Sequence, residues 1–143
     1  MDTTTAASRA PHQPRLEDDA LLRGLGRFIA DAPLPDEAQA CFVRSPHAFA
    51  DIGGIDIEAA GSVPGVLAVL TGADMDAAKI GNVSQHPPLN GRGGSNLVVP
   101  HRPALAGTTV RHVGEPVVLV VAETLAAAQD AAELVRIDYA ERP

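Results

Sequence analysis

Apolar and polar positions alternate along much of the chain, and this alternation predicts β-strands. A first strand is predicted over residues 37–44, where Cys, Phe and Val gather. Pro46 limits it, because proline has no amide hydrogen to donate to a sheet. A second strand is predicted to begin near Phe49. Its apolar spacing slips by one position at Gly53-Gly54, which predicts a β-bulge there.

Three further strands follow from the pattern. One is predicted over residues 66–70, before a helical turn that Thr71 or Asp74 could cap. Residues 116–123, PVVLVVAE, form a continuous run of mostly β-branched positions, which is typical of a central strand buried on both faces. Residues 136–139, RIDY, predict the last strand.

The main helix is predicted to begin after Thr124, whose hydroxyl can cap it, and to end near Val135. Its apolar stripe contains Leu125, Ala128, Ala132 and Val135. A strand, this helix and the last strand, in that order, predict a right-handed parallel unit. The elements together predict the α/β class (α+β mixed), with a mixed β-sheet, one main C-terminal helix and one long Pro/Gly-rich loop.

Two parts of the chain show no periodicity. Residues 1–15 are polar and contain two prolines, so they are predicted to be a flexible arm before a single domain over residues 16–143. That domain opens with a short helical turn that three acidic residues begin and Gly24 stops. Residues 81–107 are rich in Pro and Gly, with 96–99 as the longest candidate element. Such a stretch is usually a functional loop or orders only against something else.

Composition narrows the class of protein. A net charge of −7 and scattered arginines exclude a nucleic-acid partner, because a phosphate backbone would be repelled. Cys41 is the only cysteine, so no internal disulfide forms and a reducing compartment fits best. The longest clean apolar run, residues 116–122, is far shorter than the roughly 20 residues that span a bilayer. The N-terminus shows no apolar core of secretory type. We therefore expect a cytoplasmic protein that binds no membrane.

The segment Arg44, Ser45, Pro46 and His47 holds the first candidate chemistry. A serine nucleophile needs a histidine within hydrogen-bond reach and a carboxylate that orients it. Pro46 favours a turn instead, and no Gly-x-Ser-x-Gly elbow surrounds Ser45. The structural interpretation of this segment is therefore the stronger one.

Glu115 is the second candidate, because it stands just before a strand that should be buried. Burial could raise its pKa and make it a general base. The alternative, which we favour, is a residue at the entry of the strand that accepts hydrogen bonds from a neighbouring backbone or from a partner chain.

Metal and phosphate sites are poorly supported. The five histidines lack the spacing of a zinc motif. The glycine groups at residues 24–26 and 91–94 lack the remaining positions of a dinucleotide fingerprint or a phosphate-binding loop, so turns explain them better. The sequence thus predicts no catalytic, cofactor-binding or metal-ligating residue within this chain.

Five segments in order resemble the start of the molybdenum-binding subunit of the xanthine dehydrogenase and aldehyde oxidase family. They are LEDDALLRGLGRFIAD, FVRSPHAFADI, IDIEAAGSVPGVLAVLTGADM, VRHVGEPVVLVVAETLAAAQDAAELVRIDY and ERP. The resemblance covers about residues 15–143 and implies the α/β hammerhead domain of these oxidoreductases. Their cofactor is a molybdopterin that carries molybdenum, and they hydroxylate aldehydes or N-heterocycles or oxidise carbon monoxide.

By position, the resemblance implies two family motifs that are not molybdenum ligands and are candidates for a partner interface. Their residues are Arg44, Ser45, Pro46 and His47, and Gly114, Glu115 and Pro116. Where relatives typically have a second histidine and an arginine, this chain has Phe49 and Asp51. This difference favours a packing role at those two positions over a role that needs the polar side chains.

The resemblance also implies parts that this sequence does not include. The family's glycine-rich loops against molybdopterin and its catalytic glutamate lie downstream of a hammerhead domain. The cysteines of iron–sulfur clusters and an FAD-binding segment are not recognisable either. The leading hypothesis is a structural subunit or domain of a molybdenum hydroxylase. It would dock on a chain that binds molybdopterin, alongside iron–sulfur and FAD subunits. The rival is a free-standing, non-catalytic binding module with the same fold.

Overall fold

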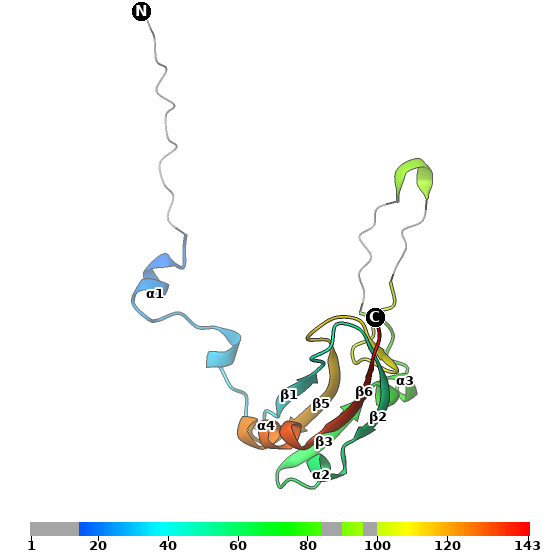
Figure 1. Cartoon of the computed structure of the whole chain (residues 1–143). Helices are drawn as coiled ribbons and strands as arrows, with labels where there is room; N and C mark the ends of the chain where they lie inside the picture. The colour runs from blue at the N-terminus through cyan, green and yellow to red at the C-terminus, as the bar shows by residue number, and fades with distance from the viewer. Residues whose placement is uncertain (1–14, 84–89, 96–99) are drawn as a thin grey trace, which may run out of the picture. The chain divides into compact units, whose positions relative to one another are not determined.

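The computed structural model describes residues 15–83, 90–95 and 100–143 (Figure 1). Nearly all of the predicted arm and the candidate element over residues 96–99 lie outside the described residues. The chain forms two compact units that divide between Pro35 and Asp36.

The first unit contains short helical turns. Helix α1 spans Asp18–Leu22, and the 3-10 helix η1 spans Ile29–Asp31. The predicted acidic start of the first turn is present, and Gly24 follows the turn with a φ of +69°. Glycine adopts this left-handed conformation without a steric cost, which explains why the helix stops there.

The second unit contains two three-stranded sheets (Figure 1). The first sheet has the strand order β1-β5-β3, formed by β1 (Gln39–Arg44), β5 (Pro116–Ala122) and β3 (Val66–Thr71). The second has the order β4-β2-β6, formed by β4 (Thr109–Val110), β2 (Ala50–Asp56) and β6 (Arg136–Glu141). The predicted bulge is confirmed, because the register between β2 and β6 shifts between Ile52 and Gly54.

The predicted parallel unit is wrong, although the mixed α/β class is confirmed. Strand β5 and strand β6 belong to different sheets, and every strand pair in the described residues is antiparallel. The physical reason lies in β5, which has β1 on one edge and β3 on the other. No edge of β5 is left for the last strand. Strand β6 therefore pairs with β2 in a second sheet.

Short helices connect the strands. They are α2 (Glu58–Gly61), α3 (Gly72–Ala77), η2 (Arg92–Gly94) and the main helix α4 (Leu125–Leu134). The predicted cap of α4 is confirmed, because the Thr124 hydroxyl accepts a hydrogen bond from the amide of Ala127 at 3.2 Å. Thr71 caps α3, and Asp74 completes a capping box with it. No helix of the described residues is long and apolar enough to cross a membrane.

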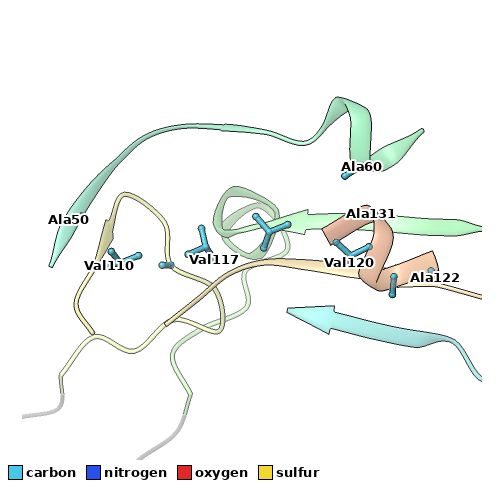
Figure 2. Close-up of a cluster of buried hydrophobic side chains, with 10 residues drawn as sticks. Ala50, Ala60, Val110, Val117, Val120, Ala122 and Ala131 are labelled. Carbon is cyan, nitrogen blue, oxygen red and sulfur yellow. The ribbon is translucent and has the colours of Figure 1, made fainter. Parts of the chain in front are cut away.

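The core consists of alanine and valine side chains that come from both sheets, from α2 and α4, and from the segment before β4 (Figure 2). Its largest fully buried members are Val110, Val117, Val118 and Val120. Helix α4 contributes Ala128 and Ala131, both fully buried, so the predicted stripe is only partly right. Leu125, the first residue of the helix, is 49% exposed. Alanines at the centre of the stripe let the helix approach the valines closely, and the larger side chains stay at its margins.

Candidate interaction site at the Arg44–His47 turn

The two motifs singled out in the sequence lie next to one another. Arg44 Nη1 donates a hydrogen bond to the carbonyl of Gly114 at 2.9 Å. The amide of Gly114 donates to the carbonyl of Ser45 at 2.8 Å, and the amide of Ser45 donates to the carbonyl of Glu115 at 2.9 Å. Backbone and side chain therefore join two segments that are 70 residues apart.

The antiparallel pairing of β1 with β5 brings these segments together. Its register shifts after Val43, so that Arg44 faces Pro116. Pro116 has no amide hydrogen and cannot continue the ladder as a donor, which explains an irregularity at this position. Gly114 has a φ of +86°, a left-handed conformation that suits glycine in the tight turn before the strand.

The Ser45 hydroxyl stabilises the turn itself. Ser45 is buried, and its Oγ accepts a hydrogen bond from the amide of His47 at 3.0 Å and donates one to the carbonyl of His47 at 3.1 Å. The imidazole of His47 has a different partner, since its Nδ1 lies 2.8 Å from Glu141 Oε1. Hydroxyl and imidazole are thus engaged separately, which is not the arrangement of a nucleophile and its base.

Tyr139 lies beneath this turn. Its ring centroid is 4.7 Å from that of His47, and its hydroxyl is buried without a hydrogen-bond partner in the described part of the chain. Burial raises the pKa of the Tyr139 hydroxyl, and the nearby Ser45 hydroxyl lowers it in part. Ser45 acts here as a neighbouring dipole, because its own hydrogen bonds go to the His47 backbone.

Glu115 is held by the backbone of the preceding turn. It is only 7% exposed, and its Oε2 accepts a hydrogen bond from the amide of Arg111. The Nδ1 of His112 lies 3.6 Å from the same oxygen. This geometry matches the structural alternative considered for Glu115, in which the carboxylate braces the entry of β5.

Glu115 also lines a hollow of about 620 Å³ at the base of the long loop. The loop base is closed by two hydrogen bonds: the Val83 amide donates to the Arg102 carbonyl at 2.9 Å, and the Arg102 amide donates to Asn82 Oδ1 at 3.1 Å. The other described residues that line the hollow are Pro100, His101, Pro103, Ala104, Arg111, His112 and Pro116.

Phe49 and Asp51, the two positions where the resemblance implies a histidine and an arginine, share one partner. Arg142 Nε donates to Asp51 Oδ2 at 2.6 Å, and its guanidinium carbon lies 5.5 Å from the centre of the Phe49 ring. Asp51 Oδ1 also accepts a hydrogen bond from the Thr109 hydroxyl at 3.1 Å. Phe49 and Asp51 thus together hold the guanidinium of Arg142.

Sequence reasoning missed Tyr139, Glu141 and Arg142 as members of the site. They reach it because β6 pairs with β2, which places Glu141 opposite Ala50. The only available signal was the residue types at Phe49 and Asp51, an aromatic ring and an acid, which together suit a basic partner.

No group of three or more His, Cys, Asp or Glu side chains in residues 15–83, 90–95 and 100–143 is placed to hold a metal ion. His47 and His112 are each next to a single carboxylate. His12 and His86 lie outside the described residues.

A model of one protein family matches most of the chain. It is the aldehyde oxidase and xanthine dehydrogenase, a/b hammerhead domain, and it matches residues 23–143.

Curated relatives match as well. The nicotine 6-hydroxylase large subunit of Paenarthrobacter nicotinovorans is 46% identical over 125 residues, which cover 87% of this chain and 15% of the relative. The carbon monoxide dehydrogenase large chain of Afipia carboxidovorans is 37% identical, over 90% of this chain and 15% of the relative.

The chain is also similar to a solved structure. Quinoline 2-oxidoreductase from Pseudomonas putida 86 superposes with a TM-score of 0.78 at 40% identity, over 90% of this chain and 16% of that one. The chain therefore spans about 15% of the length of the curated relatives that it matches.

Proposed function

The chain belongs to the aldehyde oxidase and xanthine dehydrogenase family, and from this premise we propose that it is the non-catalytic hammerhead component of a molybdenum hydroxylase. In this role it packs against the polypeptide that binds molybdopterin and supports that polypeptide's substrate channel. The reaction is an oxidoreduction that the partner polypeptide carries out.

One observation carries this proposal: the polar groups of both motifs are occupied by holding the turn. Arg44 donates to Gly114, Ser45 bonds both backbone groups of His47, and the Glu115 carboxylate accepts from the Arg111 amide. These hydrogen bonds fix the shape of the turn, which suits a surface that packs against a partner. The motifs therefore support a docking role better than a catalytic one.

The names of two relatives indicate what kind of polypeptide the partner is. Two of them are named as large subunits or chains of a nicotine hydroxylase and a carbon monoxide dehydrogenase, and each is much longer than this chain. We propose that the polypeptide corresponding to the rest of such a subunit is the partner, and that iron–sulfur and FAD subunits complete the assembly.

We further propose that residues 81–107 contribute to the wall of the substrate channel. The base of this loop is closed by the pairing of Val83 with Arg102, and the hollow beside Glu115 opens next to it. Loops that a rigid scaffold positions in this way commonly carry binding functions.

Purification from the native host tests the proposal. The chain would carry an affinity tag, and the recovered material would be analysed for molybdenum, for molybdopterin and, by mass spectrometry, for cofactor-binding sequences of this family. We expect all three, on the same polypeptide or on a partner. Recovery of the folded chain with none of them would overturn the proposal and favour a free-standing binding module.

A further inference from the structure

The sheet β1-β5-β3 has two faces in different environments. On the inner face, Val118, Val120 and Ala122 of β5 are fully buried in the core. Successive residues of a strand point to opposite sides of a sheet. Leu119 and Val121 therefore lie on the opposite face, and they are only partly buried.

Cross-strand register shows which residues share this opposite face. Leu119 pairs with Phe42 of β1 and with Leu70 of β3. Two residues along, Val121 pairs with Ala40 and with Ala68. We name this surface the outer face, and its residues are Ala40, Phe42, Ala68, Leu70, Leu119 and Val121.

The outer face is apolar at all six positions, and none of the six belongs to the buried core. Phe42 is 44% exposed. An antiparallel sheet that leaves one face in water normally places polar side chains there. Contiguous apolar patches are instead typical of surfaces that contact another protein. Val117, which precedes Leu119 by two positions in β5, is fully buried. The exposed part of the face therefore ends before Pro116.

The outer face continues into the candidate interaction site. The next residue of β1 on the same face is Arg44, whose guanidinium carbon lies 5.3 Å from the centre of the Phe42 ring. Arg44 also bonds to the carbonyl of Gly114, which anchors it at the edge of the patch. Apolar centre and charged rim thus form one surface, as in protein interfaces generally.

We infer that the outer face docks on an apolar surface of the polypeptide that binds the cofactor. This inference rests on the proposed function and names the surface through which it acts. Length supports this choice of partner: the chain matches only 15% of the nicotine 6-hydroxylase large subunit, so most of that relative lies beyond the match. A polypeptide of that size can cover a three-stranded face.

Hydroxyl-radical footprinting tests the inference on the complex purified through the tag. Phe42 is expected to be labelled in the isolated chain and protected in the molybdenum-containing complex. Leu125 is the matched control, because it is 49% exposed and belongs to helix α4. Its labelling is expected to be the same in both samples.

The outcomes separate the two proposals. If no molybdenum-containing complex is recovered, the proposed function fails. If the complex is recovered and Phe42 is labelled as strongly as in the isolated chain, the proposed function stands and the outer face is not the docking surface. Protection of Phe42 in the isolated chain, together with the mass of a dimer, would assign the face to a second copy and overturn the inference.

Substitutions give an independent measurement. Ala40 and Phe42 are both exposed. A double variant that combines Ala40→Glu and Phe42→Glu is therefore expected to leave the isolated chain folded, which circular dichroism would measure. Two charges at the centre of an apolar contact should reduce the molybdenum recovered per tagged chain by about tenfold or more. Leu125→Glu should leave it unchanged. Equal recovery for both variants would overturn the inference.

Discussion

The Ser45 hydroxyl lies between the amide and the carbonyl of His47, and it is almost fully buried. The carboxylate of Asp51 likewise lies between Arg142 and Thr109. At the scale of single residues, these two polar groups thus hold the chain's own backbone and side chains. Their contributions can be measured as changes in the free energy of unfolding.

Ser45→Ala should destabilise the chain by about 1–2 kcal/mol, because the partly buried amide of His47 loses its acceptor. Urea denaturation measures the difference. Ser62→Ala is the control, since the Ser62 hydroxyl donates to the Glu58 carbonyl at the exposed end of α2 and its loss should cost less than about 0.5 kcal/mol. Equal effects of the two substitutions would contradict the assigned role of Ser45.

The pair Asp51 and Arg142 should show a coupling free energy of about 0.5–1 kcal/mol in a double-mutant cycle, as expected for a partly exposed ion pair. The cycle compares Asp51→Ala, Arg142→Ala and the double substitution by urea denaturation. The coupling should shrink at 1 M salt, because screening weakens exposed pairs. Strict additivity of the two single effects would show that the contact contributes nothing.

At the scale of elements, helix ends are controlled by side chains close in the sequence. Thr124 caps α4, and Thr71 with Asp74 caps α3, as the sequence pattern predicted. Asp74 Oδ2 accepts hydrogen bonds from both the amide and the hydroxyl of Thr71, each at 2.7 Å. These bonds, the backbone one first, lower the pKa of the Asp74 carboxyl below its ordinary value of 3.8.

The lowered pKa of Asp74 predicts a pH dependence. A carboxyl whose pKa is lower in the folded state stabilises the fold fully above its unfolded pKa, and that stabilisation is lost as the pH falls below about 3.8 toward the folded value. In Asp74→Asn the free energy of unfolding should therefore fall less steeply below this pH. Asp76→Asn, on the same helix but outside the capping box, should keep the wild-type slope. Identical slopes for all three proteins would refute the assignment.

At the scale of the whole molecule, contacts between distant segments decide the arrangement. Gly72, the first residue of α3, lies against residues 106 and 107 of the segment that leads into β4. A Cβ atom built on Gly72 would lie 2.7 Å from the carbonyl oxygen of Ala106, closer than side chains approach backbone. The glycine is therefore required by a tertiary contact.

Gly72→Ala should destabilise the chain by about 1–3 kcal/mol, because one of two backbone segments must shift. Thermal unfolding measures the change. Gly61→Ala is the matched control at the end of α2, where nothing lies within 4 Å of the added carbon. That substitution should be neutral or slightly stabilising. A Gly72→Ala protein as stable as wild type would show that the two segments separate readily.

Sequence patterns alone predict the strands around Cys41 and Val120, the bulge at Gly53-Gly54 and the cap at Thr124, because each depends on residues a few positions away. The family motifs of the sequence also singled out the two segments that hydrogen bonds join at the candidate site. The pairing of β6 in a second sheet, and not with β5, becomes evident only in the folded chain, since strand pairing depends on which edges are already occupied. That pairing brought Tyr139, Glu141 and Arg142 to the Arg44–His47 turn. The tertiary structure likewise separated the alternate residues of β5 into a buried face and the apolar outer face, because burial depends on what covers each side of the sheet.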